Sequence, residues 1–262
     1  MLLPGLKPIP SNWLGFCNVG VLSVIERRPF GTLPGDERSW LKAKQHFLFD
    51  ASKGGWGALF VWNDDEIAPA GGFGPHAHVN MEIVTYVRRG AISHRDSLGN
   101  SGRTVAGDVQ VMSAGTGIRH SEFNLETEPT QIFQIWIKPT ADGGSPAWGT
   151  KPFPKQDRAG RLVVLASGYD SDVEALPLRA EARVLGAILR RDQIVEYEIA
   201  ERRYLYLAPA VGQLLVNGVQ IDARDGVAIK NVRRLTIAAV QDSEFVLVDA
   251  PEARSAAASN AA

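Results

Sequence analysis

The amino-acid sequence predicts an all-β protein built from two antiparallel β-barrel domains of the jelly-roll kind. Three observations support this prediction. Apolar and polar residues alternate over short segments through most of the chain, while helix-period patterns are scarce. Glycine-containing turns separate these segments. The pattern of the first half recurs in the second half, beyond a stretch rich in proline and glycine.

The first half contains six candidate strands. They are HFLFD (46–50), GALFVW (57–62), MEIVTYV (81–87), GAISHRD (90–96), DVQVMSA (108–114) and QIFQIWI (131–137). Between the fourth and the fifth, SLGNSGRTVAG supplies the Gly and Asn residues that a hairpin needs at positive φ. Short strands with such turns are typical of antiparallel barrels and jelly rolls, which leave few sheet edges free.

The domain boundaries follow from a change of pattern. Residues 1–140 are expected to form the first barrel, and 141–160 an exposed linker, because this segment combines many prolines and glycines with little periodicity. Residues 161–252 repeat the alternating strands and include the hairpin signal Asn217-Gly218. We therefore interpret the second barrel as a degenerate copy of the first. Residues 253–262 are small and polar, which is typical of a disordered tail.

Composition excludes several classes of function. The formal net charge is −1, so the chain has no global field that would recruit nucleic acid or an anionic membrane. Cys17 is the single cysteine, and no internal disulfide is possible. The N-terminal segment lacks a basic region and a sustained apolar run. We expect a cytoplasmic protein without direct contacts to membranes or nucleic acid.

The distribution of histidine decides where metal chemistry can occur. The chain has five histidines, and none follows position 120, so a histidine-built site can form only in the first barrel. They are His46, His76, His78, His94 and His120.

Two short motifs predict a metal site. On a strand, residues two apart share a face, with Cβ atoms about 6 to 7 Å apart, so His76 and His78 can reach one ion. His120 and Glu122 share a face in the same way, after a glycine turn. Two such pairs facing each other would supply three imidazoles and one carboxylate. That donor set suits a divalent transition metal better than magnesium or calcium.

Spacing alone leaves some roles open. Glu82 shares strand parity with His78, so it could be the ligating carboxylate instead of Glu122, or it could anchor a ligand histidine from behind. His94 stands beside Arg95 and Asp96, where we expect a structural hydrogen bond. His46 is a candidate for lining the pocket and not for binding the metal.

Several motifs resemble those of one family. They are GFGPHAHVNMEIVTYVRRG (72–90), HRDSLGNSG (94–102), AGDVQVMSAGTGIRHSEFN (106–124) and QIWIKP (134–139). In these segments the chain resembles the pirin family of bicupins, especially bacterial members described as quercetin 2,3-dioxygenases. The resemblance extends over nearly the whole chain.

The resemblance implies one metal ion in the N-terminal cupin domain, usually iron, although manganese, cobalt, nickel, copper and zinc suit the same donors. Carried over by motif, the ligands are His76, His78, His120 and Glu122. This favours Glu122 over Glu82, although Glu82 occupies the carboxylate position of the general cupin motif.

The resemblance also implies an activity. Iron(II) or a related ion would bind a flavonol such as quercetin through its 3-hydroxyl, and Glu122 would take the hydroxyl proton. Dioxygen would then open the ring with release of carbon monoxide. We expect an apolar slot for the substrate. Its candidate residues are Phe47, Phe49, Phe60, Phe73, Met112 and Phe133.

Two alternatives remain at this stage. Eukaryotic pirins are described as nuclear cofactors whose metal state tunes contacts with transcription factors, so the chain could instead be a metal-responsive regulator that binds a protein partner. The natural substrate could also be another enol-like metabolite, with quercetin as a substitute.

Overall fold

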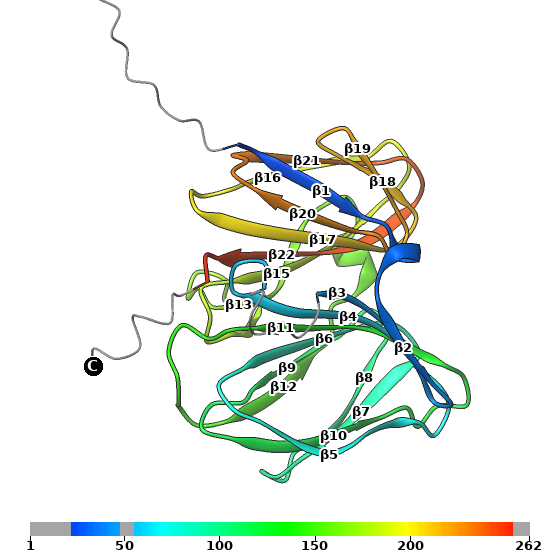
Figure 1. Ribbon diagram of the computed structural model, residues 1–262, viewed down its shortest axis with the longest axis vertical. Helices are drawn as coiled ribbons and strands as arrows, with labels where there is room; N and C mark the ends of the chain where they lie inside the picture. Colours follow the sequence, from blue (N-terminus) through cyan, green and yellow to red (C-terminus); the bar gives the residue numbers. More distant parts are fainter. Residues whose placement is uncertain (1–21, 48–54, 254–262) are drawn as a thin grey trace, which may run out of the picture.

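The computed structural model describes residues 22–47 and 55–253, and Cys17, Phe49 and the tail from residue 254 lie outside this part. It confirms the all-β prediction. The described residues form two β-sandwich domains of the cupin type, and each domain pairs a seven-stranded sheet with a four-stranded one. Figure 1 shows the four sheets as successive layers, with the N-terminal domain below and the C-terminal domain above.

The N-terminal domain supplies the lower two layers. In sheet order, its seven-stranded sheet contains β12 (Ala147–Lys151), β9 (Val109–Ser113), β6 (Glu82–Arg89), β11 (Thr130–Ile137), β4 (Leu59–Ile67), β3 (Leu41–Phe47) and β2 (Gly35–Arg38). Its four-stranded sheet contains β5 (Gly72–His78), β10 (Ile118–Phe123), β7 (Ala91–Asp96) and β8 (Ser101–Val105).

The C-terminal domain supplies the upper two layers. Its seven-stranded sheet contains β1 (Val24–Arg28), β20 (Gly226–Lys230), β17 (Arg203–Val211), β22 (Ser243–Pro251), β15 (Arg183–Leu189), β13 (Val163–Ser167) and β14 (Leu176–Pro177). Its four-stranded sheet contains β16 (Ile194–Glu198), β21 (Arg234–Ala239), β18 (Gln213–Val216) and β19 (Val219–Asp222). Two short 3-10 helices, η1 (Phe30–Thr32) and η2 (Lys155–Arg158), complete the regular elements of the described residues.

The two domains share one topology, as the repeated sequence pattern predicts. The order β9-β6-β11-β4-β3 in the first large sheet corresponds to β20-β17-β22-β15-β13 in the second, and β5-β10-β7-β8 corresponds to β16-β21-β18-β19. The hairpin at Asn217-Gly218 has φ values of 45° and 84°, as a turn with two left-handed residues requires.

The edge strands, however, are exchanged between the domains: the strand that precedes each domain in the sequence pairs with the other domain. β1 precedes the first domain in the sequence but pairs antiparallel with β20 of the second. β12 lies inside the segment expected to be a linker, 141–160, and pairs with β9 of the first domain. Each exchanged strand covers a sheet edge that would otherwise present unpaired backbone groups. The domains therefore differ from the expected boundaries at both ends.

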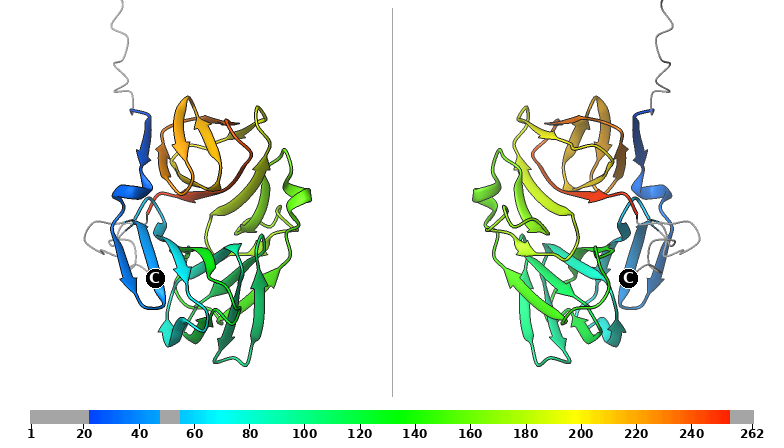
Figure 2. Two further views of the ribbon diagram at one scale, coloured as in Figure 1. Left: turned by 90° about the vertical axis from the view of Figure 1, so that its right-hand side faces the viewer. Right: turned by 90° about the vertical axis from the view of Figure 1, so that its left-hand side faces the viewer.

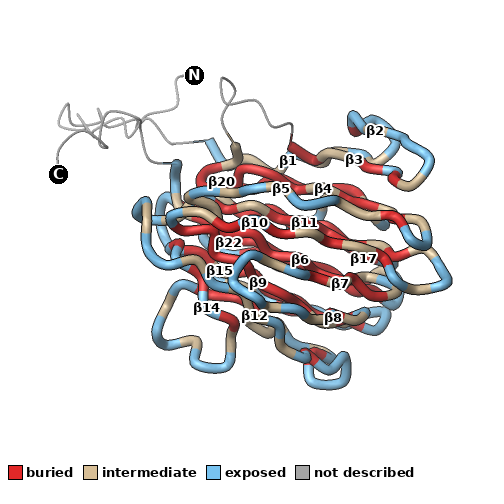
Figure 3. Tube along the Cα trace, turned by 90° about the horizontal axis from the view of Figure 1, so that it is seen from below, coloured by how far each residue is buried: buried red, intermediate tan, exposed pale blue. Residues whose placement is uncertain are grey.

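The two seven-stranded sheets pack face to face and enclose the largest apolar cluster. Its fully buried aromatic residues come from both domains and include Trp62, Tyr86, Phe133 and Tyr206. Figure 2 shows the two bodies in contact along these sheets, and Figure 3 shows buried residues concentrated along the strands, with exposed residues in the connecting loops. The C-terminal domain thus covers the outer face of the sheet whose inner face meets the histidines.

Candidate metal centre

Strands β5 and β10 bring three of the histidines together. In their antiparallel register His120 lies opposite His76, and Ile118 lies opposite His78. The ring centres of His76 and His120 are 4.4 Å apart, those of His76 and His78 4.8 Å, and those of His78 and His120 5.1 Å. One ring nitrogen of each lies within 4.8 Å of one nitrogen of the other two. A single ion can therefore be reached by all three imidazoles.

The hydrogen bonds of these rings fit metal binding. His76 Nδ1 lies 2.8 Å from the carbonyl oxygen of Gly74, so Nδ1–H donates and Nε2 keeps its lone pair. His120 is buried, and neither of its ring nitrogens has a hydrogen-bond partner among the described residues. A buried imidazole without partners is costly in a closed apolar site, and an ion bound to one nitrogen would satisfy that atom.

Burial keeps two of the rings neutral. It lowers the pKa of His78 to about 4, with His76 adding a smaller effect of the same sign. Burial likewise lowers the pKa of His120 to about 3, and His76, His78 and His94 act in the same direction. At neutral pH these rings are unprotonated, which is the state that binds a metal ion.

Glu122 lies beside this cluster but in a second, overlapping group. A register shift separates His120 from Glu122 on β10, and the Glu122 carboxylate lies within 4.8 Å of nitrogens of His94 and His120. Gln134 Nε2 donates to Oε2 at 2.7 Å, and Gln110 Nε2 donates to Oε1. Burial raises the pKa of Glu122 to about 7, although both amides act to lower it. Near neutral pH this carboxylate can accept a proton.

The residues that hold Glu122 belong to a polar row that crosses the large sheet. The row occupies directly opposed positions on five neighbouring strands: Gln110 on β9, Thr85 on β6, Gln134 on β11, Asn63 on β4 and Gln45 on β3. The sequence alone did not reveal this polar row. The available signal was an uncharged polar residue at an inward position of each strand.

The polar row divides the interior of the first sandwich. One apolar cluster, around Ile67, Ile92 and Ile132, lies on one side, and another, around Ile83, Met112 and Ile118, lies on the other. Met112 therefore packs inside the site-bearing domain.

Asp65 adds a second buried carboxylate to this interior, which sequence analysis also missed. It is 1% exposed, and within the described chain neither carboxylate oxygen has a hydrogen-bond partner. Burial raises its pKa to about 8, and the neighbouring charges of Asp64 and Glu122 act in the same direction. Burial therefore favours the protonated form of Asp65.

His94 forms the hydrogen bond that the sequence predicts, but it also faces the metal cluster. Its Nε2 lies 3.1 Å from Asp96 Oδ2, and its ring is stacked on Trp148 with centres 4.6 Å apart. The ring centre of His94 lies 5.3 Å from that of His120.

Glu82 lies on the other face of its strand, away from the histidines. Ser113 Oγ donates to Glu82 Oε2 at 2.6 Å, and the backbone N–H of Arg179 donates to the same oxygen at 3.1 Å. The parity argument fails because the chain passes from one sheet to the other at Asn80, which has a φ of 49°. Strand parity counted from His78 does not continue into β6.

Three residues proposed for the pocket, His46, Phe47 and Phe133, lie between the domains and not inside the first sandwich. His46 Nδ1 is 2.9 Å from Tyr206 Oη of the other domain, and Phe47 packs on the same tyrosine ring. Phe133 belongs to the core between the domains, and Lys138 Nζ lies over the ring of Phe60. These positions correct the expected apolar slot. Phe73 is the candidate nearest the site, with its ring centre 6.5 Å from that of His76.

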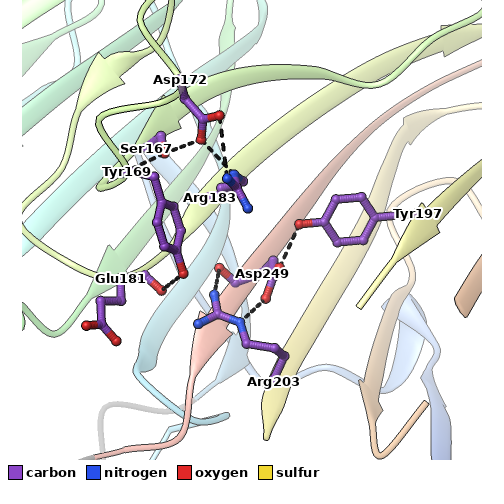
Figure 4. Close-up of polar contacts among 8 residues, drawn as sticks. All are labelled: Ser167, Tyr169, Asp172, Glu181, Arg183, Tyr197, Arg203 and Asp249. Carbon is purple, nitrogen blue, oxygen red and sulfur yellow. Dashed lines mark hydrogen bonds and ion pairs between the residues drawn. The ribbon is translucent and has the colours of Figure 1, made fainter. Parts of the chain in front are cut away.

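The second domain has hydrocarbon where the first has histidines. Its interior is an apolar cluster that includes Val195 on β16 and Ile237 on β21, the strands that correspond to β5 and β10. One group of polar side chains in this domain is paired around a buried carboxylate: Tyr197 and Arg203 both contact Asp249 at 2.6 Å (Figure 4). Among the described residues of this domain, no group of histidines and carboxylates is placed to hold a metal ion.

Fold and site together define the class of protein: a bicupin whose first domain carries a histidine-rich candidate metal site. The family model described as pirin matches residues 25–137, and the model described as quercetinase C-terminal cupin domain matches residues 164–250. A pirin-like protein of Caulobacter vibrioides is 59% identical over 231 residues, covering 87% of this chain and 100% of that protein. The chain belongs to the pirin family.

Two further relatives carry more specific descriptions. A quercetin 2,3-dioxygenase of Escherichia coli is 37% identical over 217 residues, covering 81% of this chain and 92% of that protein. The crystal structure of the bacterial pirin YhhW from Escherichia coli, in complex with nickel(II), superposes with a TM-score of 0.81 at 34% identity, covering 87% of this chain and 100% of that one. None of the helices among the described residues has the length and hydrophobicity needed to span a membrane.

Proposed function

We propose that this protein is a metal-dependent dioxygenase that opens the heterocyclic ring of flavonols such as quercetin. The observation that carries the proposal is the convergence of the imidazoles of His76, His78 and His120 inside the first cupin domain, with the buried carboxylate of Glu122 within 4.8 Å of a ring nitrogen of His120. The relatives described as quercetin 2,3-dioxygenases support the reaction type.

In this proposal His76, His78, His120 and Glu122 hold one divalent ion, iron(II) in the first instance. The same donors suit manganese, cobalt, nickel, copper and zinc. A bound divalent ion would supply Lewis acidity at this site and would stabilise the negative charge of the deprotonated substrate oxygen. Gln110 and Gln134 hold the carboxylate of Glu122 by one hydrogen bond to each oxygen.

Glu122 is the base of the proposed reaction. Burial raises the pKa of the Glu122 carboxyl, and a raised pKa suits a base that accepts the proton of the flavonol 3-hydroxyl. Loss of that proton makes the ring electron-rich. Both atoms of dioxygen then enter the product as the heterocycle opens, one ring carbon leaves as carbon monoxide, and a depside ester remains.

The test combines metal analysis with oxygen consumption. Purified protein loaded with iron(II) should consume dioxygen in the presence of quercetin, and carbon monoxide should appear in equal amount. His78→Ala should lose both bound metal and turnover. The matched control is His46→Asn, because His46 lies between the domains and should leave both intact.

Full turnover by metal-free His78→Ala protein would contradict the proposal. Metal-dependent binding of a protein partner, without turnover of any flavonol, would instead favour the regulatory role that eukaryotic pirins suggest. Turnover of another enol-like aromatic compound in preference to quercetin would keep the reaction type and change the substrate.

A further inference from the structure

Metal binding would satisfy only one of the two ring nitrogens of His120, and none of the other proposed ligands is placed as a hydrogen-bond partner for the second. A metal ion binds one ring nitrogen of a neutral histidine, so the other nitrogen carries a hydrogen and needs an acceptor. His76 has such an acceptor in the carbonyl oxygen of Gly74. For His120, which is 3% exposed, neither nitrogen has a partner within the described ranges.

His94 presents the complementary atom. Asp96 Oδ1 accepts the backbone N–H groups of Leu98 and Asn100, and Asp96 Oδ2 accepts from the Asn100 side chain. These donors favour an ionised Asp96, which can only accept, so His94 must donate from Nε2–H across the 3.1 Å contact. His94 Nδ1 then carries no hydrogen and can accept a hydrogen bond. It is buried and has no partner in the described structure.

The ring of His94 is fixed in its plane. It stacks on Trp148 at an interplanar angle of 6° and a centre separation of 4.6 Å. Trp148 is itself confined, because a Cβ added at Gly102 would lie 2.3 Å from its ring. An in-line hydrogen bond of about 3 Å between two imidazole nitrogens separates ring centres by roughly 5 Å. The centres of His94 and His120 are 5.3 Å apart.

We propose that His94 is a positioning residue that accepts the N–H of His120 at Nδ1 and is itself oriented by Asp96. The inference rests on the metal site of the proposed function. Glu122 is the other acceptor near His120, but in the proposed site its carboxylate binds the ion and both of its oxygens accept hydrogen bonds, from Gln110 and Gln134. A hydrogen bond from His120 to His94 would satisfy a ring nitrogen of each residue. It would also fix which nitrogen of His120 faces the ion.

A matched pair of variants tests this role. In His94→Asn the side-chain oxygen can take the place of Nδ1 as an acceptor, whereas His94→Leu has a similar shape and no acceptor. We expect His94→Leu to bind cobalt(II) about 10- to 100-fold more weakly than wild type, measured by competition with a chelator. His94→Asn should restore most of that affinity. The visible absorption of bound cobalt(II) should shift in His94→Leu and not in His94→Asn.

Equal affinities of His94→Leu and His94→Asn would overturn the inference, because a merely structural histidine does not distinguish an acceptor from a hydrocarbon. One cobalt(II) ion retained by a His76→Ala/His78→Ala variant and lost on adding His94→Asn would also overturn it, since His94 would then be a ligand. Failure of wild-type protein to bind cobalt(II), nickel(II) or iron(II) would reject the proposed function itself, and is therefore distinguishable.

Discussion

His46 makes the stability of this protein depend on pH in a calculable way. The side chain is 4% exposed in the interface between the domains, and burial lowers its pKa from 6.5 to about 3, with the charges of Arg28, Arg88 and Arg224 acting in the same direction. Below pH 6.5 His46 binds a proton in the unfolded chain, whereas in the folded protein it stays neutral until the pH approaches 3. The stability that neutral His46 provides is therefore complete above pH 6.5 and is lost as the pH falls toward 3.

The magnitude follows from the size of the shift. Between pH 6.5 and pH 5, His46 is protonated in the unfolded chain and not in the folded protein. Over these 1.5 pH units the free energy of unfolding therefore falls by about 2 kcal/mol. His78 and His120 contribute with the same sign, since their pKa values are also lowered by burial. Only a comparison with a variant isolates His46.

The assay is urea unfolding of metal-free protein at pH 7.5 and pH 5.0, for wild type and for His46→Asn. Asparagine does not titrate, and its amide can keep the contact that His46 Nδ1 makes with Tyr206. The free energy of unfolding of wild type should fall by about 2 kcal/mol more than that of the variant between the two pH values. Equal losses in the two proteins would refute the reasoning.

Three other substitutions have expected outcomes. Asp249→Ala should destabilise the protein by about 3 to 5 kcal/mol in urea unfolding, because it leaves the buried guanidinium of Arg203 without its carboxylate; no change would show that the ion pair is dispensable. Gly102→Ala should displace Trp148 and cost roughly 1 to 3 kcal/mol of stability, measured by the same method. Glu82→Gln should keep full metal content in elemental analysis, and loss of the metal would return Glu82 to the ligand set.

The sequence predicted the parts of this molecule that depend on local pattern. The alternation of residues within each strand identified the all-β class, and the repetition of glycine turns identified the duplicated topology. His76, His78 and His120 were found because a two-residue spacing on a strand fixes which side chains share a face, and β5 and β10 then pair in a register that brings the faces together.

The missed features depend on partners distant in sequence. The polar row around Glu122 exists only once five strands are in register, so no single strand could reveal it. The shared face expected for Glu82 and His78 does not form, because one residue with positive φ, Asn80, ends the parity of the preceding strand. β12 was hidden because AWGTK is short and lacks alternation, and its pairing depends on a free edge of β9.

The exchange of β1 and β12 makes the two halves of the chain mutually dependent parts of one molecule. A fragment ending near residue 140 would lose β12 and expose the edge of β9, two strands from the Gln134 that holds Glu122. It would also uncover the aromatic surface that faces the other half. Any miniaturised form of the metal-bearing half would need to keep residues 147–151 and acquire a new polar exterior on its large sheet.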